Sequence, residues 1–304
     1  MAKLIIGMPV YNNAGFVDEA IKSLINQTYT DWMLLISDNA STDGTSPICE
    51  GHSCADPRII YFRQSENIGG VLNFRLLLDM AIAKNAKYFM WAASDDLWES
   101  DFLIACIDNL ENNKSYGMAF TNIVNIDSFG QVIREYPDFS RFAGPSKFIN
   151  IARYLSDPEI MGKANLFYSV YRLEVCRQAW EVMPPEISQW GSDMCFVLAA
   201  LARTRIVIDE RALFKKRFPR PTDRPDMIDR VNIGEIVPHT FPLAEAQSYM
   251  ANNLRATRRT KYYLLTKAIM KYRVWRVVSD SVPLRDRIKT RIRRVIRLNL
   301  YKKI

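Results

Sequence analysis

The chain has 304 residues, of which 48% are hydrophobic and 24% charged, with only 12 glycines and 14 prolines. This balance is typical of a folded globular protein and excludes chains that are disordered throughout, collagen-like or of low complexity. No run of eighteen apolar residues occurs, so the sequence predicts no transmembrane helix. The first residues predict a buried strand and not a signal peptide, and we therefore expect a cytoplasmic protein.

The net charge of +8 is unevenly distributed along the chain. From residue 255 to the end there are 17 Lys and Arg but only two acidic residues, a net charge of +15. Residues 1–254 hold the other 24 basic and 31 acidic residues, a net charge of −7. The sequence thus predicts an acidic body with a strongly basic tail.

The first hundred residues alternate between strand and helix patterns. Apolar runs predict buried strands at residues 3–8, 32–37, 58–62 and 87–91. Apolar residues at helical spacing predict helices at residues 17–25 and 102–110 and one that follows residues 67–70. A helix-start signal predicts a further helix that begins at residue 46. The alternation predicts an α/β fold whose open, mainly parallel sheet has helices on both faces.

Beyond residue 115 the pattern is less regular. We expect strands at 116–126 and 131–136 joined by a turn at 127–130, further strands at 164–171 and 205–209, and a helix at 194–202 that Ser192 or Asp193 caps. Proline and charge rise together from residue 218 to 238, which predicts a loop or lid.

Polar side chains follow each of the first four predicted strands. They are Tyr11 and Asn12, then residues 38–43, then residues 67–70, and finally Asp95 and Asp96. In open parallel sheets, ligands bind outside the carboxyl ends of the strands. The sequence therefore predicts a ligand site at this edge of the sheet.

The adjacent carboxylates of Asp95 and Asp96 indicate a cation. Two such groups at a strand end repel each other, and Mg²⁺ or Mn²⁺ relieves the repulsion while sharing its oxygen ligands with phosphates. The alternative is that Asp96 caps the next helix and Asp95 is solvated. Asp38 also has two interpretations. It either stabilises a turn or accepts hydrogen bonds from the base or ribose of a nucleotide. Neither dinucleotide-binding nor P-loop glycine patterns occur, which disfavours both of those classes.

Six short motifs occur in a family-specific order. They are P-V-Y-N (9–12), S-L-I-N-Q-T-Y (23–29), D-N-A-S-T-D-G-T (38–45), N-I-G-G (67–70), S-D-D-L-W (94–98) and W-G-S-D (190–193). In this order the motifs resemble those of family 2 glycosyltransferases, and the resemblance covers about residues 1–215.

This resemblance implies a GT-A fold that transfers a sugar from a nucleoside diphosphate sugar with inversion. It implies that Pro9, Tyr11 and Asn12 line the base and ribose, that Asp38 holds a uracil-type base or ribose, and that Asn67 and Gly69 shape the nucleotide pocket. It further implies that Asp95 and Asp96 bind the ribose and, through Mg²⁺ or Mn²⁺, the diphosphate. Asp193 would be the general base.

The resemblance also divides the chain. It implies a glycosyltransferase domain at 1–215, with a nucleotide-sugar part at about 1–115 and an acceptor part at about 116–215. A loop or lid and linker at 216–254 and a basic amphipathic helical tail at 255–304 follow.

The sequence departs from the family pattern at two positions. Ala93 stands where many members have a carboxylate before the Asp pair, and Ser192 stands where many have Glu before the base. The Q-x-x-R-W motif of processive synthases is absent from the sequence, which favours transfer of one sugar at a time.

The basic tail has three interpretations. Apolar residues at helical spacing between Leu284 and Val295, interleaved with Arg and Lys, predict a helix that docks on an anionic membrane surface. Packing on the acidic body is the second interpretation. Nucleic-acid binding is the third interpretation, but the sequence contains no nucleic-acid-binding motif that would support specific recognition.

We thus expect a glycosyltransferase that moves one sugar from a UDP-linked donor to a hydroxyl of a glycan or lipid-linked acceptor, at the inner face of the cell membrane. The alternative is a non-catalytic nucleotide-sugar-binding or scaffold subunit recruited by its tail. A nucleotidyltransferase would need a glycine-rich phosphate loop with a basic residue after the first strand, and residues 9–15 do not provide one.

Overall fold

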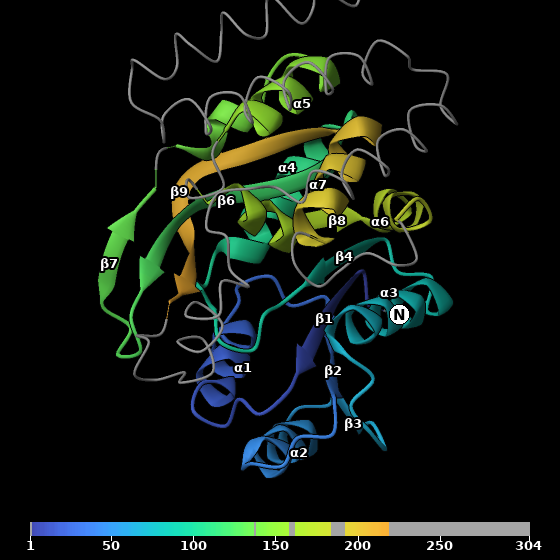
Figure 1. Ribbon diagram of the computed structural model, residues 1–304, viewed down its shortest axis with the longest axis vertical. Helices are drawn as coiled ribbons and strands as arrows, with labels where there is room; N and C mark the ends of the chain where they lie inside the picture. The colour runs from blue at the N-terminus through green and yellow to red at the C-terminus, as the bar shows by residue number, and fades with distance from the viewer. Residues whose placement is uncertain (1, 137, 158–161, 184–191, 219–304) are drawn as a thin grey trace, which may run out of the picture.

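The computed structural model describes residues 2–136, 138–157, 162–183 and 192–218, and its elements build one continuous sheet with helices around it (Figure 1). The sheet has nine strands in the order β3-β2-β1-β4-β8-β6-β9-β5, with β7 paired to β6. The mixed α/β architecture expected from the sequence is confirmed.

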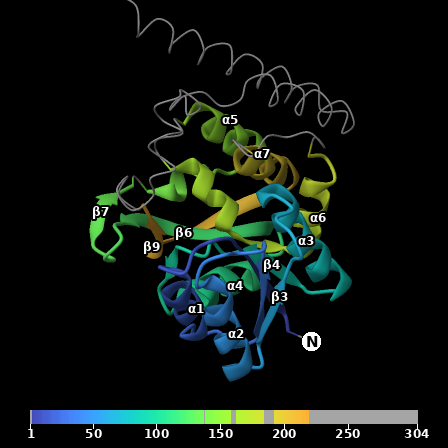
Figure 2. The same ribbon diagram turned by 60° about the horizontal axis from the view of Figure 1, so that its bottom comes forward.

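The first half of the sheet is parallel. Its strands are β1 (Leu4–Val10), β2 (Trp32–Asp38), β3 (Ile59–Arg63) and β4 (Tyr88–Trp91). Helices α1 (Val17–Ile25) and α2 (Thr45–Ala55) cover one face, and α3 (Gly70–Ala83) covers the other (Figures 1 and 2). β1 and β2 are almost entirely buried because both of their faces are covered, as their continuous apolar sequence predicts.

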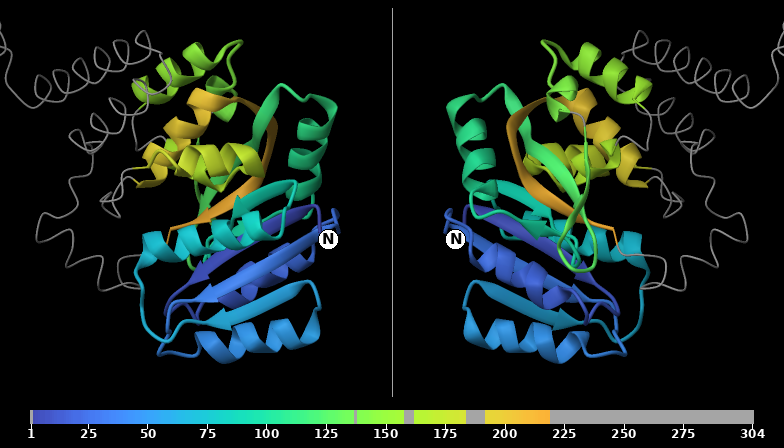
Figure 3. Two further views of the ribbon diagram at one scale, coloured as in Figure 1. Left: turned by 90° about the vertical axis from the view of Figure 1, so that its right-hand side faces the viewer. Right: turned by 90° about the vertical axis from the view of Figure 1, so that its left-hand side faces the viewer.

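The second half of the sheet is mixed. It consists of β5 (Leu97–Trp98), β6 (Tyr116–Ile126), β7 (Val132–Glu135), β8 (Val170–Arg172) and β9 (Arg205–Arg217). β6 and β9 run parallel along most of their length, whereas β8 is antiparallel to both β4 and β6. Figure 3 shows α6 (Leu173–Trp180) and α7 (Ser192–Arg203) on one side of this half and α4 (Phe102–Asn112) on the other.

Three further helical segments complete the described fold. They are η1 (Phe139–Phe142), α5 (Lys147–Ser156) and η3 (Lys163–Tyr168). α5 begins at a true cap, because the Ser146 hydroxyl accepts a hydrogen bond from the Ile149 amide. Both α5 and η3 pack against α7, so these segments fix the position of the start of α7.

The core is continuous across both halves and is centred on Trp91, the last residue of β4. The Trp91 ring is fully buried, and stacks on Phe167 with ring centroids 4.5 Å apart. Phe89 and Phe196 contact it edge-on, and the indole N–H donates to the backbone oxygen of Phe74 at 3.0 Å. These rings join β4, α3, η3 and α7 into one packed unit.

Some expected elements differ from the observed ones. The strand expected at 164–171 is the 3₁₀ helix η3 followed by the short β8, and the Ser169 hydroxyl closes that helical turn on the Leu166 oxygen. Asp96 does not cap the next helix, because β5 intervenes and α4 begins only at Phe102. β9 continues to Arg217, so Lys216 and Arg217 belong to a strand and not to the expected loop.

The loop or lid beyond residue 218 and the basic tail at 255–304 lie outside the described residues. Within the described residues, no helix has the length and apolar character to cross a membrane.

We expect Trp91→Ala to lower the free energy of unfolding by about 3–5 kcal/mol, because it leaves a cavity between the parallel half and α7. Urea unfolding followed by circular dichroism measures the change. Phe129→Ala is the matched control, since Phe129 is 79% exposed and its loss should cost less than about 0.5 kcal/mol. Equal costs for the two variants would contradict the central position assigned to Trp91.

Candidate active site

The carboxyl ends of the four parallel strands meet at one edge of the sheet, as the sequence predicts. Val10 of β1 pairs with Asp38 of β2, and Asp38 pairs with Arg63 of β3. The Ala92 amide, just beyond β4, donates to the oxygen of Gly7 in β1. The loops after these strands therefore start side by side, and we call this the carboxyl edge.

Asp38 lies beneath the carboxyl edge and organises the loop that follows β2. Its side chain is fully buried, and its carboxylate accepts hydrogen bonds from the Ser41 amide, the Ser46 hydroxyl and the Tyr61 hydroxyl at 2.6–2.9 Å. Burial raises the pKa of Asp38, but these donors together lower it more, so its pKa lies below the ordinary 3.8. Asp38 thus shapes the loop from within, and its carboxylate is not at the surface.

Asn12 and Tyr11 lie at the surface of the same edge. Asn12 has a left-handed φ of 46°, and its side-chain oxygen accepts the Thr42 amide at 2.8 Å. This contact ties the loop after β1 to the loop after β2. Tyr11 is 49% exposed, so its ring is accessible to a planar ligand. Pro9, opposite Ser37 in the sheet, supports this loop from β1.

The loop after β3 joins the carboxyl edge through an amide pair. The Asn39 side-chain amide donates to the Asn67 oxygen at 2.7 Å, and that oxygen also accepts the Gly69 amide at 2.8 Å. Gly69 has φ +83° and precedes α3, a conformation that favours glycine. The structure therefore brings Asn67 and Gly69 to the edge where the sequence placed them.

Asp96 faces a lysine that comes from β9. The Lys216 ammonium donates to one Asp96 oxygen at 3.0 Å, and the Arg217 amide donates to the other at 2.9 Å. Burial and the neighbouring Asp95 raise the pKa of Asp96, whereas the Lys216 ammonium and the Arg217 amide lower it. The effect is mutual, because Asp96 raises the pKa of Lys216 despite the burial of that lysine. The positive charge of Lys216 thus favours the ionised form of Asp96.

Arg217 fixes the loop that contains the Asp pair. Its guanidinium is buried and donates to the backbone oxygens of Asp95, Asp127 and Ser128, and to the Glu19 carboxylate at 2.6 Å. One side chain thus links the end of β4, the β6–β7 turn and α1. These contacts position Asp95 and Asp96 without contribution from a ligand.

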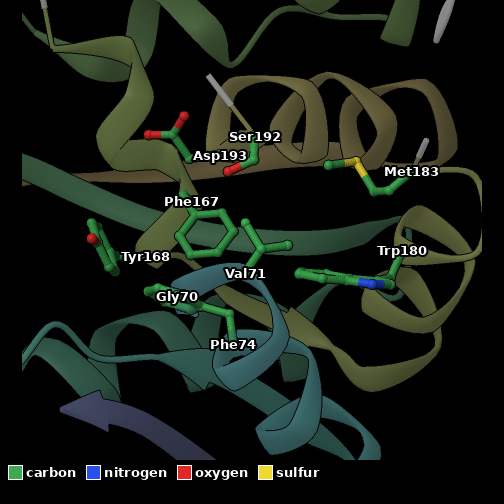
Figure 4. A pocket seen from close by; sticks show the side chains of 9 residues that line it. All are labelled: Gly70, Val71, Phe74, Phe167, Tyr168, Trp180, Met183, Ser192 and Asp193. Atoms are coloured by element: carbon green, nitrogen blue, oxygen red, sulfur yellow. The ribbon is translucent and has the colours of Figure 1, made fainter. Parts of the chain in front are cut away.

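A recess of about 260 Å³ opens beside the carboxyl edge (Figure 4). Its walls come from the start of α3, from η3, from the end of α6 and from the start of α7. The lining residues are Gly70, Val71, Phe74, Phe167, Tyr168, Trp180, Met183, Ser192 and Asp193. Asp193 and Tyr168 lie at one end and Trp180 and Met183 at the other, so the recess has a polar end and an apolar end.

Asp193 occupies the first turn of α7, where the helix dipole favours a negative charge. α7 begins at Ser192, so Ser192 and Asp193 are both within the helix and neither is its cap. Burial nevertheless raises the pKa of Asp193 to about 6, although the Met194 amide and Lys216 lower it. A carboxyl with this pKa can accept a proton near neutral pH.

Lys216 connects the two parts of the site. Its ammonium is 5.2 Å from the centre of the Tyr168 ring, and Tyr168 lines the recess with Asp193. Its charge also lowers the pKa of Asp193. Lys216 thus lies between the Asp pair of the carboxyl edge and the polar end of the recess.

Several of these residues were not expected from the sequence. Lys216, Arg217 and Tyr168 are the main ones, together with Asn39, which bridges two loops. In the sequence, the local feature that indicates these two cations is the basic run Lys215-Lys216-Arg217, which follows the apolar residues 212–214. The sequence pattern instead predicts a loop at residues 216–254.

The donor set at the Asp pair does not fit the Mg²⁺ or Mn²⁺ ion implied by the family resemblance. Both Asp96 oxygens already accept hydrogen bonds, one of them from an ammonium. In the part of the chain that the structure describes, no group of three His, Cys, Asp or Glu residues could hold a metal ion. A divalent ion here would have to compete with the Lys216 ammonium for Asp96 and take its other oxygen ligands from the diphosphate and water.

We expect Asp38→Asn to lower the free energy of unfolding by about 1–3 kcal/mol at neutral pH, because asparagine keeps one acceptor oxygen where Asp38 uses two to accept the Ser41 amide and the half-buried hydroxyls of Ser46 and Tyr61. The pKa of Asp38 is lower in the folded protein than in the unfolded chain, so the stability that its ionised carboxylate contributes is complete at pH values above the pKa of the unfolded chain. This contribution is lost as the pH falls through the lower pKa of the folded protein. The difference measured by urea unfolding should therefore be smaller at about pH 3 than at about pH 6.

The control for this prediction is Asp79→Asn. Asp79 is 47% exposed and pairs with Arg75 one turn away, so the variant should change stability by less than about 0.5 kcal/mol at either pH. An Asp38→Asn variant as stable as this control would show that the loop does not depend on the carboxylate.

Several known proteins are similar to this chain in sequence or in fold. The dTDP-rhamnosyl transferase RfbG of Shigella flexneri is 36% identical over 110 residues, which are 36% of this chain and 38% of RfbG. The chain spans well under two thirds of the length of the curated relatives that it matches.

Two solved structures share the fold. The S. aureus TarS 1-349 complex with UDP has a TM-score of 0.56 and 19% identity, and the match covers 81% of this chain and 69% of that one. The mannosyltransferase PcManGT of Pyrobaculum calidifontis, in complex with GDP-Man and Mn²⁺, has a TM-score of 0.54 and 13% identity. This match covers 97% of this chain and 80% of PcManGT.

The family model described as Glycosyl transferase family 2 matches residues 5–178, more than half of the chain. The match spans the carboxyl edge, the Asp pair and most of the walls of the recess. The chain therefore belongs to glycosyl transferase family 2.

Proposed function

We propose that this protein transfers one sugar from a nucleoside diphosphate sugar, with UDP as the carrier, to a hydroxyl of a glycan or lipid-linked acceptor, and that the transfer inverts the anomeric centre. The observation that carries the proposal is Asp193. This carboxyl has a pKa of about 6 and faces a recess beside the carboxyl edge. It meets the requirements of a general base for an acceptor hydroxyl.

The nucleoside of the donor would lie on the carboxyl edge. Tyr11 is accessible there, and Asn12 and Asn67 present polar groups from adjacent loops. Asp38 would contribute by holding the loop after β2 in shape. Gly69 lacks a side chain and so leaves the start of α3 open to the ligand. The TarS complex with UDP, which shares this fold, supports a uridine carrier.

The sugar of the donor would enter the recess from the edge. The aromatic lining residues Phe74, Phe167 and Trp180 offer ring faces on which a sugar packs. Asp193 lies at the polar end of the recess. An acceptor hydroxyl beside Asp193 would attack as its proton moves to the carboxylate, while the carbon–oxygen bond to the diphosphate breaks. In-line attack of this kind inverts the anomeric centre.

The acceptor is proposed to be a cell-surface glycan or its lipid-linked precursor. The names of relatives support this class, among them RfbG and the putative teichuronic acid biosynthesis glycosyltransferase TuaG of Bacillus subtilis. The net charge of +15 on residues 255–304 suits contact with an anionic membrane on which such an acceptor is displayed, at the cytoplasmic face.

Titration of UDP, dTDP, GDP and CDP into the full chain with Mn²⁺ present tests the donor site. We expect UDP to bind most tightly, and the matching sugar nucleotide to be consumed slowly even without an acceptor. Calorimetry measures the binding, and chromatography measures the nucleoside diphosphate released. Binding without any release would support the alternative of a nucleotide-sugar-binding subunit, and absence of binding would refute the proposal.

We expect Asp193→Asn to lower kcat by at least about 100-fold while the affinity for UDP stays unchanged, because the amide cannot accept the acceptor's proton. In the wild type, kcat/KM should fall about tenfold for each pH unit below about 6, where Asp193 becomes protonated. Glu174→Gln, which neutralises an exposed carboxylate outside the recess, is the control and should keep most activity. A fully active Asp193→Asn variant would contradict the role of the base.

A further inference from the structure

Lys216 combines an ion pair with access to the ligand. Its side chain is 24% exposed, while that of its partner Asp96 is completely buried. An ammonium has three N–H donors, and the bond to Asp96 uses one of them. The carboxylate therefore holds the ammonium in place while part of the lysine side chain stays exposed.

The position of Lys216 matches the position of the donor's diphosphate. The nucleoside is assigned to the carboxyl edge, and the sugar to the recess, so the diphosphate between them must cross the space that separates the two. Lys216 occupies the border of that space, with Asp96 on one side and the Tyr168 ring 5.2 Å away on the other.

The diphosphate needs a positive charge here, since it would otherwise approach the carboxylates of Asp95 and Asp96. The other cation at this strand end is Arg217, but its guanidinium is buried and donates to Glu19 and to three backbone oxygens. The described residues offer no acidic cluster for a metal ion, and Ala93 stands where many family members have a further carboxylate.

We propose that Lys216, held by Asp96, supplies the positive charge that binds the donor's diphosphate, so that this enzyme binds its nucleoside diphosphate without a divalent ion. The inference rests on the proposed function. Lys216 stays protonated throughout. It donates to diphosphate oxygens and stabilises the negative charge that develops on them as the bond to the sugar breaks.

The test is calorimetric titration of UDP into the full chain, once with EDTA and once with Mn²⁺. The wild type should bind UDP with affinities that agree within about threefold in the two buffers. Lys216→Met keeps the length of the side chain but removes its charge, and it should weaken UDP binding in EDTA by at least about tenfold. Binding of uridine, which has no phosphate, should not change, and this comparison separates loss of charge from loss of the site.

Lys215→Met is the matched control. Lys215 is the preceding residue of β9, so its side chain points to the other face of the strand, where it pairs with Glu99. Its loss should leave UDP binding unchanged. Lys216→Arg, which keeps the charge, should retain most of the affinity.

Lys216→Met leaves the buried Asp96 unpaired, and this variant can therefore fail to fold. In that case Lys216→Met combined with Asp96→Asn replaces it, since the combination removes both charges. A thermal melt shows whether each variant is folded. The folded double variant should show the same loss of UDP affinity with unchanged uridine binding.

The outcomes separate the two proposals. UDP binding that requires Mn²⁺, or a folded Lys216 variant that binds UDP like the wild type in EDTA, overturns the role of Lys216 and leaves the proposed function intact. If neither UDP, dTDP, GDP nor CDP binds in either buffer, the proposed function fails and the inference fails with it.

Discussion

The arrangement of the site depends on the ionised carboxylate of Asp96. This group is buried in the loop between β4 and β5, immediately before β5, where an uncompensated charge would be very unfavourable. Its two oxygens accept hydrogen bonds from the Lys216 ammonium and the Arg217 amide, so the end of β9 is held against the loop that follows β4. Arg217 then extends the contact to α1 and the β6–β7 turn. This buried charge thereby links the loop after the parallel half of the sheet to the last strand of the mixed half.

The loops of the carboxyl edge form a connected set before any ligand arrives. Asn12 joins the loops after β1 and β2, and Asn39 joins the loop after β2 to Asn67 in the loop after β3. Asp38 supports them from below through its three hydrogen bonds. Binding to a surface organised in this way costs less ordering entropy than binding to separate flexible loops. The aromatic walls of the recess are similarly anchored, because Phe74 and Phe167 pack on the buried Trp91.

Local sequence patterns predicted the parallel half well, because apolar runs and helical spacing report directly on burial there. The rule that parallel strands end at a common edge then placed Asn12, Asp38, Asn67 and the Asp pair together, as observed. The patterns did not predict the role of β9. Its pairing with β6 joins residues about ninety positions apart, and Lys216 meets Asp96 from 120 positions away. Short-range periodicity has no information on such contacts, so the lysine was assigned to a loop and its ion pair with Asp96 was not predicted.

The ion pair between Arg217 and Glu19 spans 198 residues, and this separation has a consequence for how the protein reaches its native state. Closing so large a loop costs chain entropy that only the assembled sheet repays. The helices and parallel strands of the first 112 residues make mostly nearby contacts and can form early during synthesis, whereas the Asp pair gains its cations only when β9 has left the ribosome. We therefore expect nascent chains to acquire a compact core well before they acquire a competent catalytic centre, so that ligand affinity reports on the completion of folding more sensitively than secondary structure does.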